Sequence, residues 1–286
     1  MTQIIAVITQ EFVTVVSDRR LSYLNEDGSF KEIKTDNECK LVALCEHSCI
    51  AYTGLADIGG YATYEWITRT LKNYRCIDGW HAGNILAKEI QKCLKNISKS
   101  YSHMTFLITG WKNTNKGLLP FTLRMSNAYN HDDSWNKTAT DNFRYKLITL
   151  LSNELPESMV VGVPLKREQR RRIKSHLSKT TKRRTLPFAT LEYLSKEIVN
   201  SKNIMVGDNV LGVTIPKNQI EEANKKGKYF IGHHVPNTTR STFTYYEKGS
   251  NVLNIYGPSH VCGDSAMIDF SGSMDNGVVS ASFKVV

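Results

Sequence analysis

Four residues near the start of the chain are of types that could carry out nucleophilic chemistry together: Thr2, Asp18, Lys40 and Gly54. A threonine hydroxyl is a weak nucleophile that needs a nearby base. A lysine in a closed site is costly unless a carboxylate pairs with it, and glycine lets a backbone N–H approach a substrate closely. Simpler roles exist for each residue. Asp18 can end a strand or pair with an adjacent arginine, Gly54 can form a turn, and Lys34 is a rival to Lys40.

The first two of these residues lie at the ends of a predicted hairpin. Residues 3 to 8 and 12 to 17 are β-branched and apolar, which is typical of strands. A turn centred on Gln10 would place Thr2 opposite Asp18, and a slip of two residues would leave them diagonal neighbours, about 7–8 Å apart. The predicted register therefore brings the hydroxyl and the carboxylate to one end of the hairpin.

The other two residues lie at the ends of a second predicted hairpin. Its strands cover residues 40 to 45 and 49 to 53, on either side of the sequence "EHS". A turn centred on His47 would place Lys40 opposite Gly54. Spacing alone does not say whether the open ends of the two hairpins meet.

The remaining elements alternate in blocks of strands and blocks of helices. Predicted helices cover residues 56–75, 81–98, 165–179 and 188–201, and further strands lie within residues 103–111, 120–129, 145–152, 158–163 and 209–215. Such blocks favour an α+β fold over a doubly wound sheet, with two sheets face to face and a helix pair outside each. We predict one domain over residues 1–215 and a mainly β C-terminal extension over residues 216–286.

The composition is that of a soluble globular protein, since the 286 residues are 41% hydrophobic and 22% charged. No apolar run approaches the roughly 18 residues of a membrane helix, and the N-terminus lacks a basic leader. We therefore expect a cytoplasmic protein that does not bind membranes. The six cysteines form no CxxC pair and are expected to be reduced. No P-loop or Gly-x-Gly-x-x-Gly motif is present, and we predict neither a cofactor nor a metal.

Positive charge is concentrated in residues 166–184, "KREQRRRIKSHLSKTTKRR", which we call the basic segment. It holds ten Lys or Arg against the single Glu168. Such a run can attract an acidic partner, although it is also typical of a solvated helix face. No aromatic residue interrupts the run, so a platform for stacking nucleic-acid bases is not expected.

Two stretches of the chain resemble proteasome β-type subunits and the bacterial proteasome-like proteins: "TQIIAVITQEFVTVVSDRRLS" and "CKLVALCEHSCIAYTGLADIGG". The shared features are a threonine that can become N-terminal, an acid followed by Arg-Arg, a Lys-Leu that opens the next hairpin and a Gly-Leu that closes it. "TFLITGW" looks like the central strand of the family, and the resemblance covers roughly residues 2 to 215. It implies an N-terminal nucleophile hydrolase with a four-layer αββα sandwich.

The resemblance also implies a role for each candidate residue. Thr2 becomes the first residue after removal of Met1, its Oγ is the nucleophile and its freed α-amine is the base. Lys40 carries a positive charge beside them, Asp18 orients Lys40, and the backbone N–H of Gly54 points at the developing oxyanion. The implied protein is a threonine-type peptidase or amidohydrolase, a homo-oligomer acting on peptides or proteins, with an unfoldase as a further partner. The alternative is an inactive proteasome-like subunit that binds an acidic partner through the basic segment.

The chain departs from the family pattern at two places. Val163, in "VVGVP", stands where the family has the serine of a Gly-Ser-Gly turn. Asn200 and Asn203 stand where the family has the acid and the serine of an Asp-x-x-Ser-Gly pattern, and asparagine can hydrogen-bond but carries no charge. After a small shift, Asp208 or Ser201 could take these positions.

Overall fold

A computed structural model describes most of the chain. The described residues are 2–25, 29–44, 48–71, 79–130, 132–151, 154–183, 187–218, 220–221, 244–246, 253–256, 259–262, 266–275 and 278–285. They form a mixed α and β structure, compatible with the predicted α+β class.

The first sheet has four antiparallel strands in the order β12-β1-β2-β13. Their bounds are Glu157–Gly162 for β12, Gln3–Ile8 for β1, Phe12–Asp18 for β2 and Val210–Pro216 for β13. Every residue of β1 and β2 is buried, which explains why these strands read as continuous apolar runs rather than as alternating patterns.

The second sheet begins with five antiparallel strands in the order β11-β10-β9-β6-β5. Their bounds are Arg144–Thr149 for β11, Gly117–Ser126 for β10, Thr105–Thr114 for β9, Ser48–Thr53 for β6 and Leu41–Leu44 for β5. Two small antiparallel pairs stand apart from both sheets: β3 (Leu21–Leu24) with β4 (Phe30–Thr35), and β7 (Asp57–Ile58) with β8 (Tyr61–Ala62).

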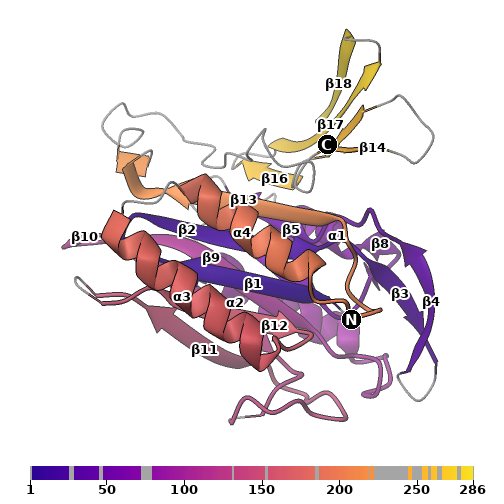
Figure 1. Ribbon diagram of the computed structural model, residues 1–286. Helices are drawn as coiled ribbons and strands as arrows, with labels where there is room; N and C mark the ends of the chain where they lie inside the picture. Colours follow the sequence, from indigo (N-terminus) through magenta and orange to yellow (C-terminus); the bar gives the residue numbers. More distant parts are fainter. Residues whose placement is uncertain are drawn as a thin grey trace.

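C-terminal strands extend the second sheet beyond β5. Strand β16 pairs in parallel with β5, and the order continues β16-β17-β15-β14, with β18 paired to β17 (Figure 1). The bounds are Thr244–Tyr246 for β14, Leu253–Tyr256 for β15, Ser259–Cys262 for β16, Ala266–Asp275 for β17 and Val278–Val285 for β18. The domain boundary at residue 215 stays a prediction.

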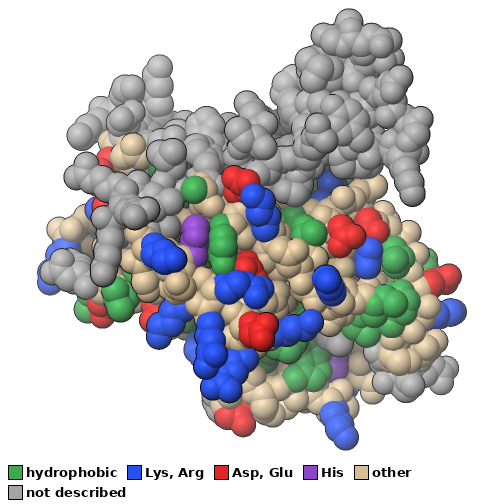
Figure 2. Space-filling model, viewed as in Figure 1, with side chains coloured by type: hydrophobic (Ala, Val, Ile, Leu, Met, Phe, Trp, Pro, Cys, Tyr) green, Lys and Arg blue, Asp and Glu red, His purple; other side chains and the backbone are tan. Residues whose placement is uncertain are grey.

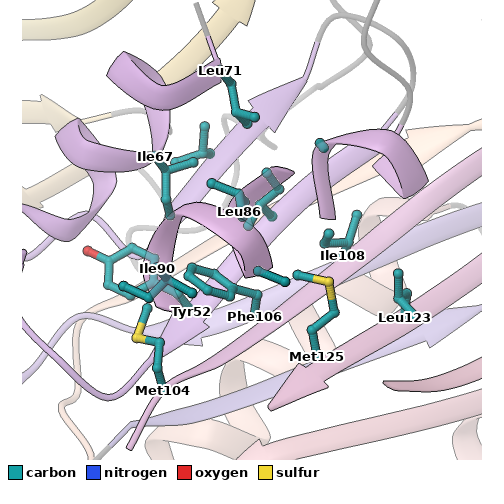
Figure 3. Close-up of a cluster of buried hydrophobic side chains, with 14 of the residues drawn as sticks. Tyr52, Ile67, Leu71, Leu86, Ile90, Met104, Phe106, Ile108, Leu123 and Met125 are labelled. Atoms are coloured by element: carbon teal, nitrogen blue, oxygen red, sulfur yellow. The ribbon is translucent and has the colours of Figure 1, made fainter. Parts of the chain in front are cut away.

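Two helix pairs cover the sheets on opposite sides. Helices α3 (Arg167–Arg183) and α4 (Pro187–Val199) lie across the first sheet in Figure 1, and α1 (Thr63–Leu71) and α2 (Gly79–Leu94) lie behind the second. Figure 3 shows the core under α1 and α2, where Leu86 points toward the strands that carry Phe106 and Met125. Burial of these apolar side chains drives the packing of helix on sheet.

Two further cores lie between the two sheets and between the first sheet and α3 and α4, and β1 contributes to both. Ile4, Ala6 and Ile8 join residues of the second sheet in one cluster, whereas Ile5 and Val7 pack with α3 and α4. This alternation is the two-residue period of a strand that has both faces covered. The hairpin that begins the chain is therefore enclosed on both faces.

The predicted helix over residues 56–75 is wrong at its start, because α1 begins at Thr63. The preceding residues form the β7–β8 hairpin instead. Gly59 and Gly60 make its turn, with φ of 61° and 83°. Only glycine enters such left-handed conformations freely, so the glycine pair favours a turn over a helix. Residues 72–75 of the prediction lie outside the described residues.

Among the residues that the structure describes, no helix is both long and apolar enough to cross a membrane. The cytoplasmic location stays a prediction.

We predict that Leu86→Ala destabilises the fold by about 2–5 kcal/mol, because it opens a cavity under α2 where the side chain is 0% exposed. Leu151→Ala is the matched control. That side chain is 62% exposed, so we expect a change within about 0.5 kcal/mol. Urea unfolding of both variants measures the difference, and equal losses would contradict the assignment of this core.

Candidate functional site

Thr2, Asp18 and Lys40 meet at the end of the first hairpin. The Nζ of Lys40 donates to Thr2 Oγ1 at 2.8 Å and lies 3.2 Å from Asp18 Oδ2. All three residues are buried, with exposed fractions of 5%, 0% and 1% for Thr2, Asp18 and Lys40. The structure thus brings a hydroxyl, a lysine and a carboxylate into direct contact away from bulk water.

The predicted register of the first hairpin is wrong by one residue. Ile4 pairs with Ser17, which places Gln3 rather than Thr2 opposite Asp18. The reason is the turn, in which Thr9 N–H donates to the carbonyl of Phe12, so that the hairpin is centred between two residues rather than on one. Thr2 still reaches Asp18, but through Lys40.

The predicted register of the second hairpin is wrong by two residues. Leu41 pairs with Ala51, and the Tyr52 N–H donates to the Lys40 carbonyl, so Lys40 lies opposite Tyr52 and not opposite Gly54. The pairs are centred one position earlier than predicted, because β5 ends at residue 44 and β6 begins at residue 48. Packing of the two sheets, and not the pairing within this hairpin, therefore brings Lys40 to Thr2.

The Asp18 carboxylate is held by donors from separate parts of the chain. Its Oδ1 accepts from Gln3 N–H at 2.7 Å, and its Oδ2 accepts from Arg20 N–H at 3.0 Å and Gly207 N–H at 3.3 Å. A buried carboxylate needs such partners because ionised groups are costly outside water. These contacts, with Lys40, hold the carboxylate in one orientation.

Burial lowers the pKa of the Lys40 amine, and the negative charge of Asp18 opposes that shift. A third partner fixes the amine, since Nζ also donates to the Arg20 carbonyl at 2.5 Å. Thr2 Oγ1, Asp18 Oδ2 and this carbonyl together match the three donors of an ammonium group. The lysine is thus held with one N–H directed at the threonine hydroxyl.

The main chain of Thr2 is held by the turn after β12. Val163 N–H donates to the Thr2 carbonyl at 2.8 Å. The preceding Gly162 has φ of 83°, and a Cβ on it would lie 1.8 Å from that same carbonyl oxygen. Only glycine allows this approach, so Gly162 determines how closely β12 can lie against Thr2.

Gly54 lies just after β6, and its role at an oxyanion stays a prediction. It has φ of 127°, and a Cβ would lie 2.2 Å from the His103 carbonyl oxygen. A series of ring contacts leads from His103, beside Gly54, to Gly162. The His103 ring stacks on Trp135 at 5.0 Å, Trp135 meets Tyr129 edge-on at 5.3 Å, and the Tyr129 hydroxyl accepts from Gly162 N–H at 2.9 Å. These ring contacts thus connect His103, whose main chain lies against Gly54, to the residue that accepts from the Gly162 N–H.

The asparagines singled out in the sequence do not form hydrogen bonds to Thr2 or Lys40. Asn200 is exposed at the end of α4, and the Asn203 side chain accepts from Met205 N–H at 2.9 Å. Ser201 is buried and accepts from Asn203 N–H, whereas Asp208 is exposed. The segment reaches the site through a glycine instead, as the contact between Gly207 and Asp18 shows.

Sequence reasoning missed five backbone groups of the site: the Arg20 carbonyl and the N–H groups of Gln3, Arg20, Val163 and Gly207. The only signal in the sequence is a pair of glycines, one in "VVGVP" and one in "MVGD". A glycine permits a close approach but does not say which segment approaches it.

Comparison with known proteins adds no assignment, since neither a protein-family model nor a curated protein matches the chain. Among the described residues, no group of three or more His, Cys, Asp or Glu could hold a metal ion.

Over residues 166–179, where the structure describes the side chains, the lysines and arginines of the basic segment are exposed to solvent, most of them on α3. Gln169, Ile173 and Leu177 are buried at four-residue intervals, which turns the charged positions between them outward. Figure 2 shows Lys and Arg side chains gathered over this face. Arg172 is paired with Glu197 at 2.8 Å, whereas Lys174 is exposed.

A groove of about 820 Å³ lies between α3 and strands β10 to β12. Its lining includes Gly162, Trp135 and Lys174, but none of Thr2, Asp18 and Lys40. The groove therefore approaches the turn that holds Thr2 without containing the three groups in contact.

We predict that Gly162→Ala destabilises the protein by more than Gly60→Ala. Both glycines have φ of 83°, so both variants incur the same left-handed backbone cost of about 1–2 kcal/mol. Only at Gly162 would the new methyl group meet the Thr2 carbonyl, since nothing lies within 4 Å of the position at Gly60. Urea unfolding of the two variants measures this contact, and equal losses would show that β12 does not hold Thr2.

The Lys40–Asp18 pair predicts non-additive losses of stability. Lys40→Met should cost about 3–5 kcal/mol, because Asp18 is left buried without its cation. Combining it with Asp18→Asn should give less than the sum of the single losses, by about 0.5–3 kcal/mol. Lys92→Met removes an exposed pair with Glu89 and should cost no more than about 1 kcal/mol. Additive losses in chemical denaturation would argue against the pair.

Proposed function

We propose that the protein is a threonine-type peptidase or amidohydrolase in which Thr2 becomes the N-terminal nucleophile after removal of Met1, a residue outside the described part of the chain. The observation that carries the proposal is the 2.8 Å hydrogen bond from Lys40 Nζ to Thr2 Oγ1, within a buried set completed by Asp18. A nucleophile and an activating group within hydrogen-bond reach, with a third group orienting the second, form the usual arrangement of such sites.

We further propose that the fold is a four-layer αββα sandwich of the N-terminal nucleophile hydrolase type. Support comes from the three cores, which lie between α1/α2 and the second sheet, between the two sheets, and between the first sheet and α3/α4. The position of Thr2, directly before the start of β1 and close to the core between the two sheets, suits a nucleophile that must be enclosed but reachable from one edge.

In the proposed reaction, the proton of Thr2 Oγ1 passes to the freed α-amine as Oγ1 attacks the substrate carbonyl carbon. A free α-amine has a pKa of about 7.7–8.0, and the nearby charge of Lys40 would lower it further. The oxyanion is stabilised by the Gly54 N–H. Collapse breaks the C–N bond, the leaving amine takes the proton from the α-ammonium group, and water then hydrolyses the ester on Thr2.

Lys40 contributes through its contact with Oγ1. Its positive charge stabilises negative charge that develops on the attacking oxygen, and the lowered pKa makes exchange of a proton with that oxygen less costly than for an exposed lysine. Asp18 holds Nζ in place for this contact. We propose that the chain acts on peptides or proteins as a homo-oligomer, with an unfoldase as a further partner.

A second candidate function is favoured by the exposed basic face of α3. In this case the chain is an inactive proteasome-like subunit that binds an acidic partner through that helix. Removal of Met1 decides between the two, because a retained methionine leaves the Thr2 nitrogen as an amide without a free base.

The test of the proposed function is an intact mass measurement followed by treatment with a peptide epoxyketone, which reacts with an N-terminal threonine. We expect a mass lower by one methionine residue and a single adduct on Thr2. Lys40→Met should slow adduct formation by about 100-fold or more. Thr2→Ala should give no adduct, whereas Thr114→Ala, at an exposed position near the end of β9, should react as the parent does.

A retained methionine together with the absence of an adduct would contradict the enzymatic proposal. Salt-sensitive binding of poly-glutamate by the same sample would then favour the second candidate, because contacts between exposed charges weaken as salt screens them.

A further inference from the structure

The groove beside α3 follows an open edge of the first sheet. Strand β12 is last in the order of that sheet and, within the described part of the chain, pairs with β1 alone. All of its residues except Val161 line the groove. The opposite wall includes Lys146 and Ile148 of β11, the edge strand of the second sheet (Figure 1). The groove therefore lies where both sheets end.

Alternate backbone groups of β12 point away from β1. Val163 N–H donates to the Thr2 carbonyl, so in this antiparallel register every second residue back along β12 bonds to β1. The N–H and C=O groups of Ser158, Val160 and Gly162 are left on the outer side. The Gly162 N–H shows this direction, since it donates to a tyrosine hydroxyl outside the sheet. No described strand pairs with Ser158 or Val160 on that side.

An open strand edge is a place where an extended peptide can bind as a further strand. Its main chain would bond to the outer groups of β12, and its side chains would alternate between the two faces of the sheet. One row would face α3, because Val160 packs against the core under that helix. The other row would face the second sheet, because Met159 packs in the core between the sheets. The groove volume of about 820 Å³ is large enough for such a ligand.

The wall formed by α3 is positively charged. Arg170 and Lys174 lie about one helical turn apart, both line the groove and both are exposed. Neither forms an ion pair with a residue that the structure describes. Glu157 also lines the groove, but it lies on the same face of β12 as Met159, which is turned away from α3. Acidic side chains of a bound strand would therefore meet these two cations.

The opposite wall differs in its chemistry, because its cations already have a partner. Asp133 accepts from Arg124 at 2.5 Å and also from Lys146. Two large apolar side chains of the lining are exposed, with exposed fractions of 45% for Trp135 and 66% for Leu155. Exposed apolar surface beside an open strand edge is typical of a binding site. This side of the groove therefore favours apolar side chains.

A second copy of the chain fits this edge poorly. Pairing of two β12 edges about a two-fold axis would place two α3 helices on the same face of the joined sheet. Arg170 and Lys174 of each copy would then approach like charges, which oppose association. Charge complementarity favours an acidic ligand instead.

We infer that the open edge of β12 binds an extended peptide segment in which acidic and apolar residues alternate. The acidic side chains contact Arg170 and Lys174, and the apolar ones pack on the wall that holds Trp135. This inference goes beyond the proposed function, because it uses neither Thr2 nor its amine. It also differs from the second candidate function, since it assigns the ligand to a groove and a strand edge rather than to the basic helix as a whole.

The test is fluorescence anisotropy of the labelled, end-capped peptide Glu-Val-Glu-Val-Glu-Val with the full chain. Arg170→Gln combined with Lys174→Gln should weaken binding at least about tenfold, as expected for lost hydrogen bonds to charged groups. Arg171→Gln combined with Lys179→Gln is the matched control. It removes the same charge from exposed positions of α3 outside the groove lining, and should weaken binding by less than about threefold.

A second pair of variants tests the strand edge itself. Ser158→Pro removes an outward N–H without removing a bond to β1, a position where an edge strand tolerates proline. It should weaken peptide binding about three- to tenfold, whereas Ser158→Ala keeps the N–H and should bind as the parent does. Hydrogen exchange of the parent protein needs no variant. Saturating peptide should slow exchange of the Ser158 and Val160 amides.

Three results would each overturn the inference. Equal losses from the two double variants would mean that the peptide responds only to the total charge of α3. Unchanged exchange at Ser158 and Val160 in the saturated complex would mean that no strand is added. Equal affinity for the peptide Glu-Glu-Glu-Val-Val-Val, which has the same composition without alternation, would remove the two-faced groove. None of these results bears on the adduct at Thr2, so the proposed function is tested separately.

Discussion

The buried ion pair between Lys40 and Asp18 is the interaction on which the rest of the site depends. Two charges removed from water are stable together only when their remaining hydrogen-bonding groups are satisfied. Here the carboxylate accepts hydrogen bonds from N–H groups of three segments, and the amine donates to the Thr2 hydroxyl and to the Arg20 carbonyl. The pair therefore orders the start of β1, the end of β2 and the segment after α4 around one point.

The same constraint connects the fold to the chemistry. Both sheets must pack closely for Lys40, at the start of β5, to reach Thr2, at the start of β1, and the core between the sheets provides that packing. On the other side of Thr2, Gly162 allows β12 to approach the Thr2 carbonyl closely. A hydroxyl held between these elements keeps one orientation, which the proposed role of Thr2 as a nucleophile would require.

Burial has a different consequence at each charged group near the site. It lowers the pKa of Lys40 and raises that of Glu38, because in both cases it disfavours the ionised form. Asp18 compensates Lys40 with an opposite charge in contact, whereas the buried oxygen of Glu38 has no hydrogen-bond partner. One carboxylate is thus held by a cation in direct contact, whereas the other is influenced by the charges of Lys40, Lys34 and Arg19.

The sequence by itself determined the strands of the first hairpin, the four helix-forming segments apart from the start of α1, and the residue types of the candidate site, because each follows from a pattern of neighbouring residues. It did not determine either hairpin register, since one residue in a turn shifts every pair beyond it. Only the tertiary structure decided that Lys40 reaches Thr2 and that Gly207 and Val163, rather than Asn200 or Asn203, contact the site. These contacts join segments far apart in the chain, and their geometry depends on how sheets and helices pack together, which no local pattern encodes.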